Sequence, residues 1–442
     1  MTQTASAPPA TRAPVVPQAA APGPRPQSPV ARQPLGRVAT WFDGTPGRMR
    51  ALLIIAAVVS VVFGLTAAQG FNQSDGALSR AEANTAQLVR IQAIHTNLVS
   101  ANADATNAFL VGGLEPPAQR QHFTDSLNTA AKLIAEAATA QPADQQALGA
   151  LNVTLLTYQG LIEQARANNR QGLPLGSQYL KDASATLQQD SLPVLSELVK
   201  ANQARVDSEF DGIDRGGIWL VAGSLLALAA LVASLWWLAQ RTHRYLNVPI
   251  AAAAVVVLLT LVIGGGSLAG ASNSAKETRD ISYADTLALS QARIAAYDAK
   301  SNESLTLIAR GSGTAFEEAW KKSAATVDEQ LLRGGSTSPA VERQWKAYKA
   351  AHEKIRGLDD KGNWDGAVDL AIGTGRSTSN AAFAAFDKSS ADRLANLSDA
   401  TQSELDAAGG SLGVLGWLGL PIGIVTALLA AWGFSQRLEE YR

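Results

Sequence analysis

The chain has 442 residues and a formal net charge of −1, with 47% hydrophobic and 17% charged residues. This balance offers no basis for binding nucleic acid, and the absence of cysteine excludes disulfides, thiolate nucleophiles and cysteine-based metal sites. The histidines have no metal-ligand spacing, and no P-loop, nucleophile-elbow, kinase or zinc-protease motif occurs. The sequence therefore predicts a protein without metal or cofactor that is not an enzyme. The histidines are His95, His122, His243 and His352.

The first 50 residues are rich in Pro, Ala, Gln and Thr and contain few large apolar side chains. A segment of this composition cannot bury enough surface to offset the entropy lost on ordering. We therefore expect residues 1–50 to form a disordered tail.

Four apolar runs follow, and none of them contains Asp, Glu, Lys or Arg. A helix of about 20 apolar residues is long enough to cross the hydrocarbon core of a bilayer. Each run therefore predicts one transmembrane helix. The boundaries that we assign are 51–69, 216–240, 249–271 and 411–434.

Basic residues flank the first run, lie in the turn at 241–248 and recur in the last tail at 435–442. They include Arg48, Arg50, Arg241, Arg244, Arg437 and Arg442. Short basic flanks stay in the cytoplasm, so both termini and the turn are predicted to be cytoplasmic in a multi-pass protein of the plasma membrane. Residues 70–215 and 272–410 are then extracytoplasmic.

Both outer segments are rich in Ala and have apolar residues three and four positions apart, which is typical of helices. Clusters of Gly and Pro divide each segment into about four helices. Because each segment begins and ends at the membrane, we expect an up-down bundle. The predicted fold is an all-α membrane protein with four transmembrane helices and two tandem extracytoplasmic four-helix bundles. The expected breaks are Gly112–Pro117, Pro142, Asn168–Gly176, Gly311–Gly313, Gly334–Pro339 and Asp359–Gly366.

A shift of 190 residues aligns parts of the two outer segments. In both, a tyrosine precedes a helical turn with Glu and Arg, and a polar turn with two glycines follows. This agreement predicts an internal repeat. The aligned residues are Tyr158, Glu163, Arg166, Gly172, Gly176 and Leu180 with Tyr348, Glu353, Arg356, Gly362, Gly366 and Leu370.

The first helix of the first segment has an apolar stripe with the four-and-three spacing of a heptad, and His95 and Asn102 interrupt it. One interpretation is a small polar pocket inside each bundle that is fit for an amino acid. The alternative is that these residues are satisfied polar groups of the core that fix register. The comparable stripe in the second segment is Leu287, Gln291, Ile294, Asp298, Ser301, Leu305 and Ile308.

Asn168, Asn169 and Arg170 lie where one helix of the first segment ends and a polar turn begins. Asn and Gly suit the left-handed and capping positions of such a turn. They either make the turn alone, or they also form a contact surface for an outer partner at the end of the bundle.

The layout resembles the four-helix-bundle sensor modules of bacterial chemoreceptors and related kinases, arranged in tandem. The runs ADATNAFLVGGLEPP at 103–117 and ARANNRQGLPLGSQYLKDAS at 165–184 are similar to an actinobacterial family of four-pass membrane proteins, the GlnX-like family. Members are encoded with a glutamine-type solute-binding lipoprotein and the Ser/Thr protein kinase G. The resemblance implies a relay of amino-acid status from the lipoprotein to the kinase.

We therefore expect a transmembrane sensor whose partners are the lipid bilayer, an extracytoplasmic solute-binding lipoprotein and a cytoplasmic protein kinase. A homodimer is an open alternative, and nucleic acid is not expected. Two other functions stay open: a structural or assembly protein of the cell envelope, and an accessory subunit of an amino-acid transporter.

Overall fold

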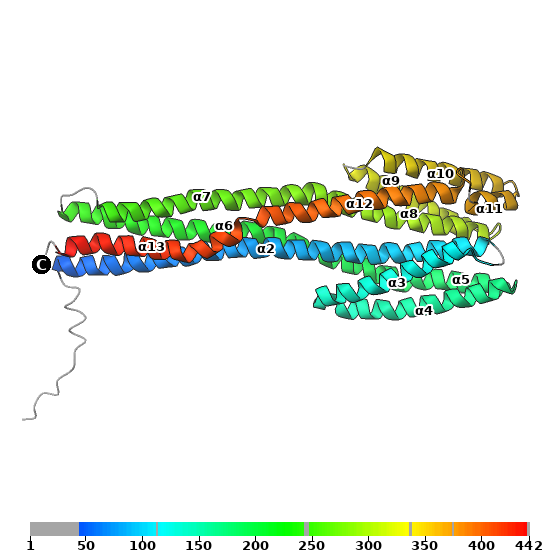
Figure 1. Ribbon diagram of the computed structural model, residues 1–442, viewed down its shortest axis with the longest axis horizontal. Coiled ribbons are helices and arrows are strands. Elements are labelled where there is room, and N and C mark those ends of the chain that lie inside the picture. Colours follow the sequence, from blue (N-terminus) through cyan, green and yellow to red (C-terminus); the bar gives the residue numbers. More distant parts are fainter. Residues whose placement is uncertain (1–43, 112–113, 243–246, 336–337, 374, 440–442) are drawn as a thin grey trace, which may run out of the picture. The chain divides into compact units, whose positions relative to one another are not determined.

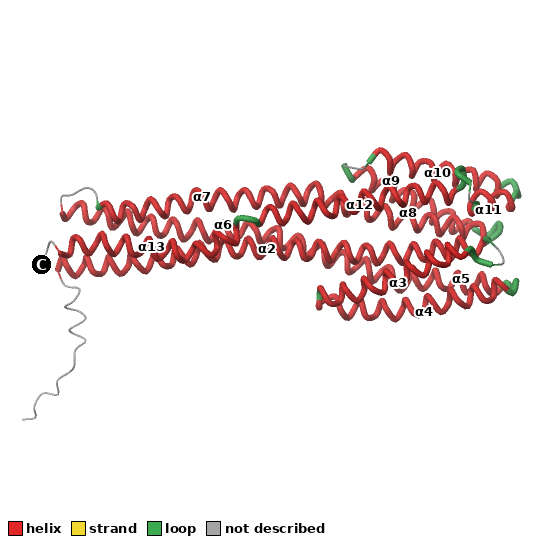
Figure 2. The backbone as a smooth tube through the Cα atoms, viewed as in Figure 1, coloured by secondary structure: helices red, strands yellow, loops and turns green. Residues whose placement is uncertain are grey.

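The computed structural model describes residues 44–111, 114–242, 247–335, 338–373 and 375–439. Helices make up nearly all of these residues, and no strand occurs among them (Figure 2). The predicted all-α fold is thereby confirmed. Most of the expected tail at 1–50, His243 and Arg244 of the turn and the last three residues lie outside the described ranges.

The first half of the described chain forms one apolar segment, a set of outer helices and a second apolar segment. Its elements are α2 (Gly44–Leu110), α3 (Pro117–Ala140), η1 (Pro142–Asp144), α4 (Gln145–Arg170), α5 (Leu175–Thr186), the π-helical η2 (Leu187–Ser191) and α6 (Leu192–Thr242).

The second half follows the same plan. Its elements are α7 (Val248–Thr278), the π-helical η3 (Arg279–Tyr283), α8 (Ala284–Ile308), α9 (Thr314–Arg333), α10 (Pro339–Asp359), α11 (Trp364–Ile372), α12 (Ser379–Gly409) and α13 (Leu412–Glu439).

The helix ends are set by the turn residues that the sequence pointed to. Gly172 and Gly362 both have positive φ, 68° and 77°, which favours glycine. The backbone bonds from Leu173 to Asn168 and from Asn363 to Leu358 recur 190 positions apart, each 3.0 Å long. The two turns are therefore equivalent, whereas the wider internal repeat stays a prediction.

One break was not expected. The fourth outer helix of the second half is split between α11 and α12, where the Thr378 side chain caps α12 by accepting a hydrogen bond from the Ala381 amide. Such capping by threonine stabilises a helix start. In the first half, α5 continues through η2 into α6.

Four helical stretches, namely Gly44–Leu110, Leu175–Arg241, Val248–Ile308 and Ser379–Glu439, are long and apolar enough to cross a membrane. Their apolar portions expose large side chains, among them Leu225, Leu259 and Leu428, at 57%, 51% and 65%. Apolar surface of this extent fits contact with acyl chains rather than water. The fold is that of an all-α membrane protein.

The apolar segments of α2, α6, α7 and α13 run alongside one another (Figure 1). Small residues bring them together. A Cβ on Gly64 of α2 would lie 2.7 Å from the Cα of Gly423 of α13, and one on Gly70 of α2 would lie 2.6 Å from the carbonyl oxygen of Gly216 of α6. Only glycine permits backbones to approach so closely, as in other membrane helix pairs. In addition, Asn247 at the start of α7 donates to the Gly433 carbonyl of α13 over 2.8 Å.

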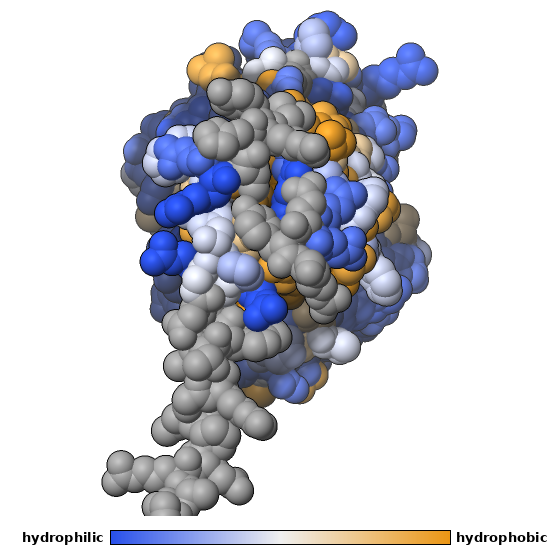
Figure 3. Space-filling model, turned by 90° about the vertical axis from the view of Figure 1, so that its left-hand side faces the viewer, coloured by the Kyte–Doolittle hydropathy of each residue, from blue (hydrophilic) through white to orange (hydrophobic). Residues whose placement is uncertain are grey.

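Charged residues, Arg241 and Arg437, lie in the last turns of α6 and α13 at one end of these segments. Seen end-on, the molecule shows hydrophilic side chains beside hydrophobic ones there (Figure 3). Such basic residues suit the interface between lipid and water.

The outer helices form two bundles with separate cores. The first core joins α2, α3, α4, α5 and α6 around Ile91, Leu98 and Tyr158. The second joins α8, α9, α10 and α12 around Trp345 and Tyr348, and it also includes Val99 and Ala103 of α2. The two bundles are therefore in contact along α2 and α8.

Three apolar segments continue into bundle helices without a non-helical residue: α2 directly, α6 from α5 through η2, and α7 into α8 through η3. The fourth connection differs, because Gly410 and Ser411 form a turn between α12 and α13.

Candidate functional site

A cavity of about 590 Å³ lies where α2, η2 and α6 of the first bundle face α8 and α9 of the second. Ligand sites commonly have volumes of roughly 300–1,000 Å³. The lining is mostly polar and includes Gln92, His95, Gln188, Lys200, Asp298 and Lys322. The cavity therefore has the size and the chemistry of a site for a small polar solute.

The helical spacing explains why these side chains meet. Gln92 and His95 are three residues apart on α2 and so share a face. Asp298 and Asn302 have the equivalent spacing of four on α8. Gln188 lies in the π-helical η2, and such π-segments occur frequently at functional sites because they re-aim side chains.

Several polar groups at this cavity have no partner among the residues that the structure describes. The Nε2 atoms of Gln92 and His95 are buried without a hydrogen bond. Gln92 as a whole is only 3% exposed. Native proteins leave few buried polar groups unpaired. These groups are therefore available to water or to a ligand.

Burial also shifts the ionisation of two lining residues. Desolvation lowers the pKa of His95 to about 4 and raises the pKa of Asp298 to about 7. His95 is therefore neutral at neutral pH, and Asp298 carries charge at a cost that a nearby cation would offset.

Asn102, the second polar residue of the predicted stripe, lies away from this cavity. Its Nδ2 donates to Ser301 Oγ of α8 over 2.7 Å, and its Oδ1 accepts from Ser184 Oγ over 2.9 Å and from the Tyr158 hydroxyl over 3.4 Å. It is 2% exposed. Asn102 thus matches the alternative of a satisfied core group that fixes register, whereas His95 lines a cavity between the bundles rather than inside one.

The turn residues Asn168, Asn169 and Arg170 lie at one end of the first bundle. Asn168 Nδ2 donates to the Gln164 carbonyl over 2.8 Å, and Asn169 Nδ2 donates to the Phe109 carbonyl over 3.5 Å. Asn169 and Arg170 also line a cavity of about 360 Å³. They therefore make the turn and border a cavity as well.

The two motifs that carry the family resemblance meet at this smaller cavity. Glu115 lies between α2 and α3, and its carboxylate pairs with the Arg166 guanidinium of α4 over 2.8 Å. Arg166 in turn lies 4.1 Å above the Phe123 ring. Leu114 is 82% exposed beside them. An exposed apolar side chain next to paired charges suits a protein contact better than a deep ligand site.

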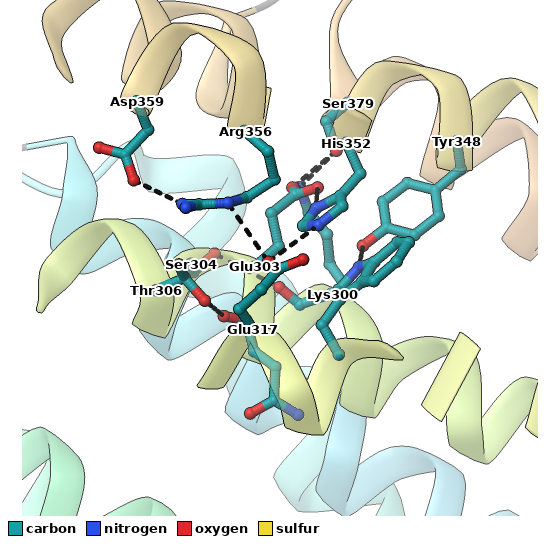
Figure 4. Close-up of polar contacts among 12 residues, drawn as sticks. Lys300, Glu303, Ser304, Thr306, Glu317, Tyr348, His352, Arg356, Asp359 and Ser379 are labelled. Atoms are coloured by element: carbon teal, nitrogen blue, oxygen red, sulfur yellow. Dashed lines mark hydrogen bonds and ion pairs between the residues drawn. The ribbon is translucent and has the colours of Figure 1, made fainter. Parts of the chain in front are cut away.

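A buried charged cluster in the second bundle was not predicted from the sequence. The Lys300 ammonium lies 2.7 Å from Glu303, which is 0% exposed and also accepts from Ser379 Oγ over 2.7 Å. His352 connects Glu303 at 3.1 Å with Glu317 at 3.3 Å (Figure 4). The signal was a Lys and a Glu three positions apart on a helix that is otherwise rich in Ala, Ser and Leu.

Each group in this cluster adjusts the ionisation of the next. Burial alone would raise the pKa of Glu303, but the charges of Lys300 and His352 lower it to about 2. Burial alone would also lower the pKa of His352, but its hydrogen bonds to Glu303 and Glu317 raise it above the usual value. The cluster is internally paired and so has little capacity left for a ligand.

No group of three or more His, Asp or Glu in the described part of the chain is placed to hold a metal ion. Glu303 and Glu317, the carboxylates beside His352, form the ion pairs described above.

Comparison with known families gives one result that bears on function. Residues 77–211 match the actinobacterial sensor domain. This stretch runs from α2 into α6 and so includes the whole core of the first bundle. Comparisons with curated proteins and with solved structures gave no match. Together with four helices apolar enough to span a membrane, the match supports a sensor role for this multi-pass membrane protein.

Proposed function

We propose that the chain is a non-enzymatic plasma-membrane sensor that relays extracytoplasmic amino-acid status to a cytoplasmic Ser/Thr protein kinase. The observation that carries this proposal is the continuity of the sensor domain with the membrane helices. The matched residues 77–211 begin on α2 and end on α6, and both helices continue into apolar segments.

Helical continuity gives the relay a physical basis. A helix transmits a shift or rotation along its length, because its backbone hydrogen bonds resist bending. A ligand or partner that favours one of two bundle arrangements biases the positions of the attached spans. The cytoplasmic tails and the turn at 241–248 then present that bias to the kinase.

The outer partner in this proposal is a solute-binding lipoprotein that docks at the end of the first bundle. Support comes from the exposed Leu114 beside Asn169 and Arg170, and from the two family-like motifs that meet there through the bond from Asn169 to the Phe109 carbonyl. The charges of Arg120 and Glu115 at the same cavity supply a polar rim, as protein interfaces commonly have.

The orientation that we propose places both termini and the turn in the cytoplasm, because Arg241 and Arg437 end α6 and α13. Protease-sensitive reporters after Arg442 and within 241–248 should both be protected from external protease in intact cells. Cleavage of either reporter by external protease would show that the proposed orientation is wrong.

The function is tested by capturing cross-linked partners from membranes, with and without added amino acids. We expect a solute-binding lipoprotein and a Ser/Thr kinase, with kinase capture that depends on the amino acid. Insertion of four glycines after Ala77 of α2 should abolish that dependence while leaving lipoprotein capture intact. The same insertion at Gly335, between α9 and α10, serves as the control. Capture of permease subunits alone, or a kinase signal indifferent to amino acids, would contradict the proposal.

A further inference from the structure

We propose that the cavity between the two bundles binds a zwitterionic amino acid directly, with its ammonium group on Asp298 and its carboxylate on Lys322. The inference deepens the proposed function, on which it rests, by assigning the sensor a ligand of its own besides any that the lipoprotein carries.

The first step concerns the carboxylate. Asp298 lines the cavity from α8, and its side chain has no hydrogen-bond or ion-pair partner among the described residues. Elsewhere in the same bundle, the buried Glu303 pairs with Lys300 and the partly exposed Asp387 pairs with Arg293, whereas the buried Asp285 leaves Oδ2 without a hydrogen bond. A desolvated carboxylate without a partner is costly. A primary ammonium group is the ligand chemistry that would satisfy it.

The second step concerns the opposite charge. Lys322 of α9 is exposed at the rim of the same cavity, and its ammonium has no partner in the described ranges. Lys200 of α6 also borders the cavity, but Glu197 pairs with it at 2.7 Å. The cavity thus offers one free anion and one free cation among its described lining residues, which is the complement of a zwitterion.

The third step concerns the neutral groups between these charges. Gln92 is 3% exposed, lines the cavity and leaves its Nε2 donor unpaired. His95 leaves Nε2 unpaired beside it, and burial lowers the pKa of His95 so that the ring stays neutral. A donor amide and a neutral imidazole suit the polar atoms of an amino acid and add no charge that would compete with Asp298.

The alternatives fit less well. A metal ion needs several acidic or imidazole ligands, and the described residues contain no such group. An apolar ligand would leave Gln92, His95 and Asp298 desolvated without hydrogen bonds, which costs free energy. An amino acid satisfies all three groups.

Occupancy of this site would also act on the relay. Its walls come from α2 and α6 of one bundle and from α8 and α9 of the other. A ligand that bonds Gln92 on one side and Asp298 on the other favours the arrangement in which these helices are close. Each of α2, α6 and α8 continues into an apolar segment, so the same contacts bias the spans.

The test uses the full chain in lipid nanodiscs, without lipoprotein or kinase, titrated calorimetrically with the standard L-amino acids. We expect at least one of these amino acids to bind, at one site per chain. The N-acetyl derivative of that amino acid, which lacks the ammonium charge, should bind about 10- to 100-fold more weakly, as should the chain with Asp298→Asn. Lys322→Gln should weaken binding of the amino acid but not of the corresponding amine that lacks the carboxylate.

Two matched variants control for surface charge. Asp399→Asn on α12 and Lys346→Gln on α10 remove the same charges from exposed positions and should leave affinity unchanged. Thermal unfolding shows whether each variant is folded.

The inference fails if no amino acid binds, or if binding is indifferent to Asp298→Asn or to N-acetylation. If no amino acid binds but kinase capture still responds to amino acids through the lipoprotein, only the direct site is lost and the proposed function stands. If binding occurs without any kinase response, the site stands and the relay is lost.

Discussion

Each bundle has an aromatic pair in its core that includes a buried tyrosine. In the first, the Phe123 and Tyr158 ring centroids are 6.5 Å apart; in the second, those of Trp320 and Tyr348 are also 6.5 Å apart. Both tyrosines are fully buried. The groups around the two tyrosines then differ in charge.

Neutral groups surround Tyr158 in the first bundle, whose buried ion pair, Asp144 with Arg205 at 2.8 Å, involves η1 and α6 instead. Asn102 bonds to the hydroxyls of Ser184, Tyr158 and Ser301. Hydroxyl bonds of this kind contribute only about 0.5–1.5 kcal/mol each, so they can be exchanged for others at small cost. The contacts around Asn102 are therefore easier to exchange than buried ion pairs.

Charged groups occupy the polar centre of the second bundle. Lys300 and Glu303 are 4% and 0% exposed, and His352 stacks on Trp320 with 3.6 Å between ring centroids. Moving one member leaves a buried charge alone, which is strongly unfavourable. The groups around Tyr348 are therefore harder to rearrange than those around Tyr158.

Among the variants that test this comparison, Glu303→Ala should have the largest effect. It leaves the Lys300 ammonium buried without its partner, so we expect a loss of about 3–5 kcal/mol in the stability of the second bundle. Hydrogen exchange measured by mass spectrometry should show faster exchange across α8, α9 and α10. Glu342→Ala on the exposed face of α10 should change little. Equal loosening of α3 and α4 would remove the distinction between the bundles.

Asn102→Ala should have a smaller effect that reaches both bundles. The Ser184 hydroxyl loses its acceptor, Asn102 Oδ1, and the Ser301 hydroxyl loses its donor, Asn102 Nδ2. We expect this to cost about 1–3 kcal/mol of stability. Exchange should rise in α5 and in α8 together. Asn97→Ala, whose amide bonds only within α2, is the control. Loosening confined to α5 would mean that the bond to Ser301 contributes nothing.

Asp298→Asn should stabilise the ligand-free chain by about 1 kcal/mol, at the low end for a buried polar group because the carboxylate faces a cavity. Burial raises the pKa of Asp298 to about 7, so the folded state loses stability as pH rises from 3.8, the ordinary pKa of an aspartate, towards 7. The gain from the variant should therefore be absent below pH 3.8 and complete above about pH 7. Melting temperatures across that range check this, and a gain independent of pH would contradict it.

The smallest expected effect is the pH dependence of His352→Gln. The pKa of His352 is raised above 6.5, so its ion pairs stabilise the second bundle fully below pH 6.5 and less as pH rises through the folded value. Glu303 keeps its charge there, because its pKa lies below 4.5. The difference between wild type and variant in melting temperature should be largest between pH 4.5 and 6.5. A difference that grows above pH 7 would reverse this assignment.

The sequence was sufficient for the parts of the fold that depend on local composition. Apolar runs such as 249–271 predict spans because length and hydropathy decide insertion. Turn glycines such as Gly172 and Gly362 predict helix ends because few other residues adopt positive φ. The split between α11 and α12 was missed, because the cap at Thr378 is a short signal within a polar stretch.

The site depended on contacts between residues far apart in the chain, which periodicity does not supply. His95 and Asp298 both stood on predicted stripes, but only the packing of α2 against α8 puts them at one cavity. Asn102 lies on the same stripe as His95, for which a pocket and a satisfied core group were both open, and three hydroxyl groups satisfy it. Glu303 and His352 were passed over because 49 residues separate them.

The turn at Gly410 and Ser411 decides which bundle the last span follows. Torsion in α12 can dissipate at this joint before it reaches α13, whereas α2 has no such joint above its span. Within the membrane α13 is held to α2, since a Cβ on Gly419 would lie 2.5 Å from the Ala68 amide nitrogen and one on Gly423 would lie 2.6 Å from the Cα of Gly64. The end of α13 should therefore follow movements of α2 and the first bundle, although the second bundle precedes α13 in the chain.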